Sequence, residues 1–561
     1  MFYDVAIIGA GPCGLAVAAR LREKTPSALF TNEEHSRYWR KHKRQAFSLE
    51  SETKKRKVST DSGYGSEIEG QSLAQDHKPS IVVLDSNSNE WLSNWKQRFA
   101  ELKISHLRSP LFFHPDPRDR DGLLAFAHEQ ERPDELREIP NVVGRELSKH
   151  ETKQQKSRRT RKKVAHHLRV DGRDQIDYFT PSSSLFEDYC ESIIDRYNLR
   201  GVVQSRRVLD IGYDQQPANL EHGLFTIQTD VDEVFSRCVI IATGAGGPPK
   251  VPCPLQATTP LDSGSFIHCF QPEGTALPRH IKQKVACRKP TNVLIVGGGL
   301  TSAQLVDLFI ARHNVSRVHL LIRSPKLKVK HFDVDLSWVT KTRNHRMAEF
   351  WSADTDEERL EMFREARDGG SINPPFHKIL QKHVQNNRLS IYLGTELIMD
   401  SSCVWDANHK AWTHLNISPE ITALPPVDHI VYATGNPPKF ENIPFLQSLR
   451  KNHPLETLGG LPLISEDLSW SDDVPCFFTG GMAALRLGPG AANLAGARQG
   501  AERVAWKVED ILDDQLDTTS AADLSLNRTQ EQDRKDRAEE YSSFSASARN
   551  QFAALSISDG D

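Results

Sequence analysis

Two glycine-rich turns, each set between an apolar strand and a helix, constrain this chain most strongly. The first lies in FYDVAIIGAGPCGLAVAARL, residues 2–21, and the second in NVLIVGGGLTSAQ, residues 292–304. In this arrangement the backbone N–H groups at the helix start can hold the pyrophosphate of a dinucleotide. The chain therefore predicts two nucleotide-binding folds of the Rossmann type.

The first turn has the full fingerprint, with Gly9, Gly11 and Gly14 at the required spacing directly after the first apolar strand. A turn with a purely structural role is the alternative, and the alanine-rich helix that follows argues against it. The acid that normally ends the second strand is displaced by a polar stretch, and SIVVLD then ends in Asp85. We expect Asp85 to bind the ribose.

The second turn keeps Gly297 and Gly299 but has Ser302 in the third position, where a small residue still permits close helix packing. The following strand, SRVHLLIR, ends in Arg323 rather than in an acid. A cation at this position suits the 2′-phosphate of NADPH, whereas a solvent-facing basic strand end is the alternative interpretation. We therefore expect NADPH rather than NADH in the second fold.

Two nested nucleotide folds indicate that one holds a flavin and that the other delivers hydride to it. A third glycine-rich turn precedes the last helix of the ordered chain and includes Gly488 and Pro489, with Asn493 close by. We expect the N-terminal dipole of that helix to face the flavin edge where negative charge develops on reduction.

The predicted fold class is α/β, with two nested Rossmann-like domains, a helical cover and polar insertions. The FAD-binding domain is expected to be discontinuous, because the NADPH-binding domain is inserted into it. The expected segments are 1–287 and 425–512 for FAD, with low-complexity insertions near 31–78 and 148–167, 288–424 for NADPH and the cover, and 513–561 as a disordered tail.

The charge balance argues against nucleic acid or an anionic membrane as a partner. The 71 basic and 74 acidic residues give a net charge of −3, which provides no global field. No apolar run reaches the roughly 18 residues of a membrane span, so we expect a cytoplasmic protein. Two basic runs, KKRK and SKHETKQQKSRRTRKKVAHH, leave nuclear import open, although solvated loops are the favoured interpretation.

The cysteine pattern argues against a metal centre and a dithiol relay. Eight cysteines are scattered along the chain without a C-x-x-C pair or a Cys/His cluster. We therefore expect no bound metal.

The order of these motifs resembles the FAD- and NADPH-dependent N-hydroxylating monooxygenases, the class B flavoproteins that include lysine and ornithine N-hydroxylases. The resemblance runs from Tyr3 to about Val508 and rests on GAGPCG, GGGLTSA and DHIVYATGN, with Thr434 and Gly435 in the last element. It implies a C4a-hydroperoxyflavin, formed from O2, that hydroxylates a small nucleophile such as the primary amine of an amino acid. Such chemistry requires no side-chain base, and we name no catalytic residue.

The resemblance also indicates substrate contacts. SHLRSPL matches the family's SFLKDL element and places Arg108 where a lysine contacts the substrate; arginine can clamp a carboxylate with two N–H groups. In the helical cover Asp333, Asp335, Trp338 and Asn373 are candidate pocket residues, although packing alone explains any one of them.

Other functions stay open at this point. A Baeyer–Villiger oxygenase is disfavoured, because its Phe-x-Gly-x-x-x-His signature is only partly present in LDSGSFIHCF. An uncoupled NADPH oxidase would share both cofactors but make no hydroxylated product. A flavin-binding protein that regulates oxidative stress or growth would bind FAD without turnover. The formation of a homo-oligomer is likewise open.

Overall fold

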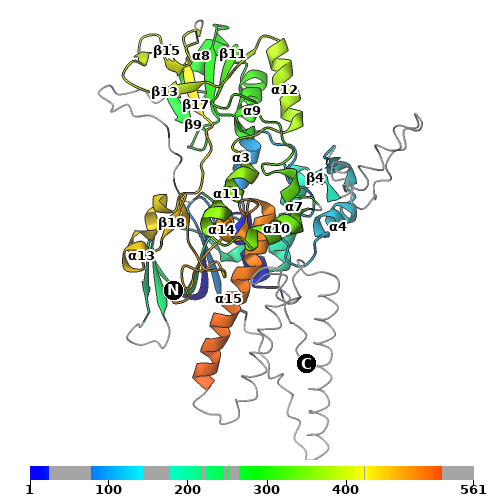
Figure 1. Ribbon diagram of the computed structural model, residues 1–561, viewed down its shortest axis with the longest axis vertical. Helices are drawn as coiled ribbons and strands as arrows, with labels where there is room; N and C mark the ends of the chain where they lie inside the picture. Colours follow the sequence, from blue (N-terminus) through cyan, green and yellow to red (C-terminus); the bar gives the residue numbers. More distant parts are fainter. Residues whose placement is uncertain are drawn as a thin grey trace, which may run out of the picture.

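The computed structural model describes residues 1–23, 78–140, 142, 177–215, 223–245, 247, 249, 251, 265–340, 342–421 and 424–520, with side chains up to residue 512. Except for Lys78, the expected insertions near 31–78 and 148–167 lie outside these residues, as does the tail after 520. The interpretation of the basic runs as import signals therefore concerns residues that the structure does not describe. Figure 1 shows two units, one above the other, each built around a sheet.

The first sheet lies in the lower unit and has the order β5-β2-β1-β8-β7-β6, with β20 paired to β8. Its strands are β1 (Phe2–Ile8), β2 (Ile81–Asp85), β5 (Val203–Ser205), β6 (Val208–Asp214), β7 (Leu224–Thr229), β8 (Glu233–Ile241) and β20 (Cys476–Phe478). β1 lies between β2 and β8 and is parallel to both, and its last five residues are buried. A strand buried on both faces is the pattern of a covered parallel sheet.

Two helices far apart in sequence cover this sheet together. α1 (Pro12–Arg20) packs against α15 (Leu494–Ser520), and α7 (Ser183–Arg196) lies beside α1. α15 continues eight residues beyond 512, where we expected the ordered chain to end. The stretch DDQLDTTS contains no proline or glycine, so nothing in it breaks the helix.

The second sheet lies in the upper unit and is entirely parallel, in the order β12-β11-β10-β17-β9. Its strands are β9 (Phe266–His268), β10 (Asn292–Val296), β11 (Arg317–Ile322), β12 (Leu389–Leu393) and β17 (His429–Tyr432), and its helices are α8 (Arg279–Ala286), α9 (Leu300–Asp307) and α12 (Pro374–Gln385). Since β9 and β17 complete this sheet, the second unit begins near residue 265 and ends near 433. The expected limits of 288 and 424 for the second unit are therefore corrected. They exclude β9, which ends before residue 288, and β17, which begins after residue 424, although both strands belong to this sheet.

The helical cover consists of α10 (Arg343–Trp351) and α11 (Asp356–Arg367), and it packs on the first unit, beside α14 (Ala484–Leu487; Figure 1). The side chain of Trp351 donates to the carbonyl of Arg486 at 3.0 Å, and Arg486 forms an ion pair with Asp356. Leu360 is part of the first unit's apolar core. The cover thus follows the second fold in sequence but belongs in space to the first.

Shorter elements complete the described structure. The remaining helices are α3 (Ser93–Glu101), α4 (Gly122–Glu129), α13 (Gln447–Asn452), α14 (Ala484–Leu487), the 3-10 segments η1 (Pro133–Glu135), η2 (Arg200–Val202), η4 (Leu336–Trp338), η5 (Phe440–Asn442), η6 (Pro444–Leu446) and η7 (Gly480–Ala483), and the π-helix η3 (Leu308–Arg312). The remaining strands are β3 (Leu136–Glu138), β4 (Phe179–Pro181), β13 (Glu396–Ile398), β14 (Val404–Asp406), β15 (Ala411–His414), β16 (Asn416–Ser418), β18 (Thr457–Leu458) and β19 (Leu461–Pro462).

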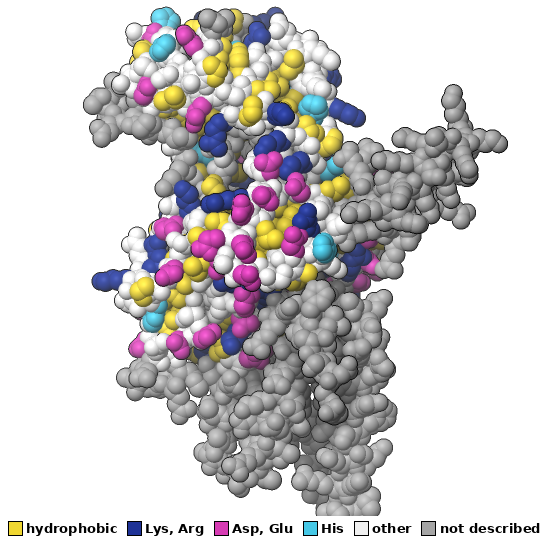
Figure 2. All heavy atoms as spheres, viewed as in Figure 1, with side chains coloured by type: hydrophobic (Ala, Val, Ile, Leu, Met, Phe, Trp, Pro, Cys, Tyr) yellow, Lys and Arg dark blue, Asp and Glu magenta, His cyan; other side chains and the backbone are white. Residues whose placement is uncertain are grey.

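The distribution of charge on the surface agrees with the nearly equal numbers of basic and acidic residues. On the face in Figure 2, basic and acidic side chains are interspersed over the described residues. None of the helices in the described part of the chain has both the length and the apolar character that a membrane span needs.

Candidate functional site

The first glycine turn connects β1 to α1 at the carboxyl edge of the first sheet. At Gly9, where φ is +109°, an added Cβ would lie 2.7 Å from the carbonyl oxygen of Ala242 at the end of β8. At Gly14 it would lie 2.2 Å from the carbonyl oxygen of Gly9, so the helix approaches the strand too closely for a side chain. At Gly11 it would meet nothing within 4 Å. α1 starts there without a side-chain cap, which leaves room for a phosphate at the helix start.

Asp85 ends β2 beside this turn, as expected. One carboxylate oxygen accepts from the N–H of Ala10 at 2.9 Å, and the other accepts from the N–H of Asn87 at 2.9 Å. Each oxygen keeps a lone pair for a further donor such as a ribose hydroxyl.

The second glycine turn repeats the frame of the first. At Gly297, where φ is +150°, an added Cβ would lie 2.2 Å from the carbonyl oxygen of Ala433. The buried hydroxyl of Ser302 donates to the carbonyl of Gly299 at 2.6 Å, so the serine binds the turn in place of the third glycine. The Ala-Thr-Gly elements at the ends of β8 and β17 thus have matching roles, because the alanine of each contacts the first glycine of one turn.

Thr434 and Gly435 follow Ala433 and lie beside the second turn rather than the first. The Thr434 hydroxyl is 3.4 Å from a ring nitrogen of His268 on the neighbouring strand β9. His268 is buried, and burial lowers its pKa. The side chain of Asn436 donates to the carbonyl of Gly247 at 2.9 Å, so the two connections between the units touch.

Arg323 lies at the carboxyl end of β11, where a nucleotide would expose its adenosine ribose. Its side chain is exposed, and within the described residues it has no hydrogen bond or ion pair. Lys328 and Lys330 differ, because they bind Asp368 and Asp335, each at 2.7 Å. The pairing of Asp335 with Lys330 also explains why this expected pocket residue points elsewhere.

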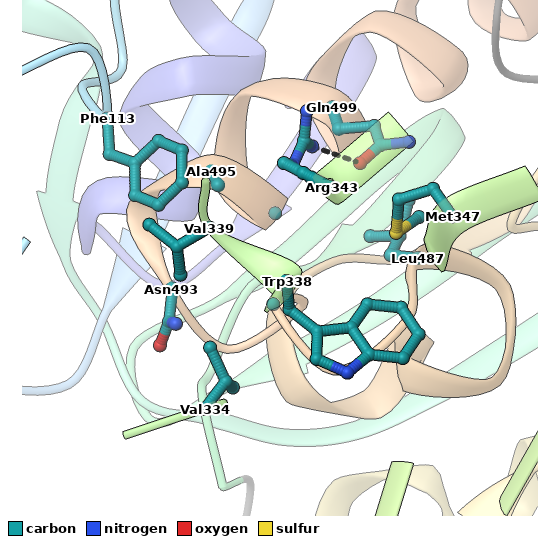
Figure 3. A pocket seen from close by; sticks show the side chains of 12 residues that line it. Phe113, Val334, Trp338, Val339, Arg343, Met347, Leu487, Asn493, Ala495 and Gln499 are labelled. Carbon is teal, nitrogen blue, oxygen red and sulfur yellow. Dashed lines mark hydrogen bonds between the residues drawn. The ribbon is translucent and has the colours of Figure 1, made fainter. Parts of the chain in front are cut away.

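A cavity of about 230 Å³ lies between the loop after α3, the loop after β11 and the turn before α15. It is lined by Arg108, Ser109, Pro110, Phe113, Phe332, Asp333, Val339 and Asn493. Phe113 and Val339 also line a second, smaller cavity with Trp338 and Met347 (Figure 3). Sequence motifs gave no signal for Phe113, Val339 or Met347, which belong to no nucleotide fingerprint.

Asp333 connects the cover to the glycine-rich turn that precedes α15. Its two oxygens accept from Asn493 and from Arg367, each at 3.0 Å, and Arg367 also donates to the carbonyl of Pro489 at 3.2 Å. Gly488 has a φ of +78°, and an added Cβ would lie 3.2 Å from the sulfur of Met347. The turn therefore lies at the cavity wall, held from the side of the cover.

Arg108 lies in the cavity wall but does not present the two-pronged clamp that we expected. Its guanidinium donates to the carbonyls of residues 330–332 at 2.8–2.9 Å, and to the hydroxyl of Ser371 at 3.0 Å. A further N–H points to the carbonyl of Ser371 at 3.4 Å. Burial lowers the pKa of Arg108 to about 10. A bidentate contact with a substrate carboxylate would have to compete with these acceptors.

Asn373 also differs from its expected role as a pocket residue. It is the N-cap of α12, where its side chain accepts from the N–H of Phe376 at 3.1 Å, and it is not among the residues that line the cavity. An asparagine directly before Pro-Pro at a helix start is a capping signal that the sequence already contained.

The described residues contain no group of three or more His, Cys, Asp or Glu side chains that could hold a metal ion. The cysteines of the described residues are all free. The described structure therefore offers two glycine turns and a cavity between the first unit and the segment that leads from β11 into the cover.

Comparisons with known proteins agree with this architecture. Residues 167–436 match the family described as L-lysine 6-monooxygenase/L-ornithine 5-monooxygenase. No curated protein matches the chain.

Solved structures share the fold over nearly the whole chain. An ornithine N-hydroxylase from Kutzneria sp. 744, with reduced FAD, NADP⁺ and L-ornithine, has 14% identity, covers 91% of this chain and 99% of its own, and gives a TM-score of 0.55. An FAD-bound cadaverine monooxygenase from Erwinia amylovora has 14% identity, 91% and 94% coverage and a TM-score of 0.53. An L-lysine 6-monooxygenase from Pseudomonas syringae has 16% identity, 91% and 99% coverage and a TM-score of 0.52. The match to the L-lysine 6-monooxygenase/L-ornithine 5-monooxygenase family thus spans residues 167–436, and the fold that this chain shares with these three monooxygenases extends over most of its length.

Proposed function

We propose that this protein is an FAD- and NADPH-dependent monooxygenase that hydroxylates the nitrogen of a small primary amine. The observation that carries the proposal is the pair of uncapped glycine turns, one on each sheet, with a cavity between the first unit and the segment that leads from β11 into the cover. The match of residues 167–436 to the family model supports the same activity. FAD reduced by NADPH would supply the activation of O2, and this chain would supply binding, orientation and exclusion of water.

The residues of the first unit fit FAD. The open space at Gly11 suits the pyrophosphate, which the α1 dipole stabilises, and Asp85 is placed to accept a hydrogen bond from the ribose. The turn that contains Gly488 and Pro489, with Asn493 beside it, would lie at the flavin ring, because it borders the cavity.

The residues of the second unit fit NADPH. Gly297, Gly299 and Ser302 build the turn, Thr434 and Gly435 border it, and Arg323 would meet the 2′-phosphate. An exposed arginine without a partner in the described structure is free to bind two phosphate oxygens at once.

The cavity would hold the amine. Phe113, Phe332 and Val339 provide apolar walls that limit water, and the substrate nitrogen must be uncharged to act as a nucleophile. The carboxylate of Asp333 is the acidic group in this wall, and its two bonds leave acceptor capacity toward an N–H of the amine.

The test is anaerobic stopped-flow reduction of the yellow protein by NADPH and then by NADH, followed by an oxygen pulse. We expect fast reduction by NADPH and a transient near-ultraviolet absorbance after oxygen, with a hydroxylamine product detected by mass spectrometry for cadaverine, ornithine or lysine. Reoxidation that yields only peroxide with every amine would instead identify an oxidase. Bound flavin that NADPH does not reduce would favour a regulatory protein.

A further inference from the structure

A short segment of the cover, Asp368–Asn373, lies against the second glycine turn, and we name it the strap. An added Cβ on Gly370 would lie 3.0 Å from the backbone nitrogen of Gly299 and 3.2 Å from the carbonyl carbon of Gly298. The strap backbone is therefore in contact with the start of α9. At the equivalent position of the first turn, Gly11 faces open space.

The strap is paired with the segment that follows β11. The N–H of Lys330 donates to the carbonyl of Ile372, and the N–H of Ile372 donates to the carbonyl of Lys328, both at 2.9 Å. The Lys328 ammonium donates to the carbonyl of Asp368 at 2.6 Å and to its carboxylate at 2.7 Å. Lys330 is 3.9 Å from the same carboxylate. The ion pairs and the backbone hydrogen bonds therefore act together to hold the strap against the segment that follows β11.

Arg108 adds a contact from the first unit. Its guanidinium is fixed by the carbonyls of residues 330–332 and reaches the hydroxyl of Ser371 at 3.0 Å. A partly buried cation hydrogen-bonded on this many sides is a rigid support, because each rotation would leave several donors without acceptors.

The strap has a joint at its start. Asp368 and Gly369 have φ angles of +45° and +74°, which end α11 in the left-handed region. At the other end α12 begins anew, capped by Asn373. The segment between the two helices can therefore change course without unwinding either one.

We propose that the strap closes the NADPH site, that Arg108 is the positioning residue that holds it there, and that the nucleotide must displace it to bind. This inference rests on the proposed function, because it takes the second turn as the NADPH site. The pyrophosphate and the strap would compete for the same helix start. The phosphates would also compete with Asp368 for the Lys328 and Lys330 ammonium groups.

The test uses the full-length, FAD-loaded protein, with NADP⁺ as the probe and calorimetry as the measurement. Asp368→Asn and Ser371→Ala weaken the strap's contacts without touching the glycine turn, and we expect each to lower the Kd for NADP⁺ by about threefold to tenfold. Glu349→Gln is the matched control, because it removes an exposed carboxylate paired with Arg346 on the cover, away from the strap. It should leave the Kd unchanged.

Hydrogen–deuterium exchange provides a readout that does not depend on activity. Addition of NADP⁺ to the wild-type protein should raise exchange at residues 368–373, since displacement breaks the bonds at Ile372. A Kd that is unchanged or higher in both variants, or a fall in exchange at the strap, would overturn the inference and make the strap a wall of the site. No NADP⁺ binding by the wild-type protein would instead contradict the proposed function.

Discussion

The two glycine turns share a backbone frame but differ in their surroundings. In each, the first glycine lies against the carbonyl of an alanine, Ala242 or Ala433, at the end of a neighbouring strand. At the middle glycine the turns diverge, because Gly11 faces open space whereas Gly299 faces the strap. The motif fixes how the chain bends, and a segment about 70 residues away decides whether the helix start is accessible.

The largest effect is expected from Gly14→Ala, which tests the shared frame. The new Cβ would lie 2.2 Å from the carbonyl oxygen of Gly9, so α1 must shift away from β1. We expect a loss of about 3 kcal/mol in the free energy of unfolding, together with loss of bound flavin. Denaturant unfolding followed by circular dichroism measures the first, and visible absorbance the second. Wild-type stability in this variant would contradict the packing described here.

Gly11→Ala and Gly299→Ala test the divergence at the middle position. Both glycines have φ angles that alanine adopts, −81° and −94°, so neither substitution should destabilise the fold. We expect Gly11→Ala to weaken FAD binding about tenfold or more through lost contacts with the charged pyrophosphate. Gly299→Ala should keep FAD and weaken NADP⁺ binding. Flavin content measures FAD binding, and calorimetry measures NADP⁺ binding. Loss of FAD in Gly299→Ala together with weaker NADP⁺ binding in Gly11→Ala would assign each cofactor to the other turn.

Arg323→Glu tests the chemical difference between the two sites. We expect the KM for NADPH to rise about tenfold to a hundredfold, because a charged phosphate contact is lost, with little change for NADH. Lys289→Glu, the same charge reversal on the exposed segment between α8 and β10, serves as the control. Equal effects of Arg323→Glu on both nucleotides in steady-state kinetics would remove the 2′-phosphate assignment.

The smallest effect is expected for the stability of the fold in acid. It compares the two units through one buried histidine in each, His114 in the first and His319 in the second. Burial lowers the pKa of His114 to about 3 and that of His319 to about 4, from an ordinary 6.5. A lowered pKa means that the unfolded chain binds the proton first, so stability is complete above pH 6.5 and falls as the pH drops. Each histidine contributes at most about 1.4 kcal/mol per pH unit.

We therefore expect His114→Gln and His319→Gln each to flatten the dependence of the unfolding free energy on pH between pH 6.5 and 4. Urea unfolding at a series of pH values measures this slope. A slope that neither substitution changes would show that other groups control the acid response.

The sequence predicted features that depend on neighbouring residues along the chain. Strand, turn and helix follow one another directly at both motifs, so Gly9, Gly297 and the ends of β2 and β11 could be located from their spacing. The domain limits were wrong because β9 and β17 are only three and four residues long. The pairing of β17 with β10 and of β9 with β17, rather than a local pattern, assigns both strands to the second sheet.

Single residues with several acceptable partners were harder to place. Arg108 matched a substrate-binding element, yet its guanidinium is surrounded by carbonyls from residues 330–332 and by Ser371, more than 200 positions away. Asn373 was read as a pocket residue although it precedes Pro-Pro, a capping signal that needed no tertiary information.

By itself, the sequence determined that two strand–turn–helix units exist and what charge ends each second strand, Asp85 in one and Arg323 in the other. These properties depend on short-range sterics and on the identity of single residues. Only the tertiary structure decided that the cover packs on the first unit, that Arg108 supports the strap and that the strap lies on the second turn. Those outcomes depend on burial and on hydrogen-bond partners that long-range folding brings together, and no local pattern encodes them.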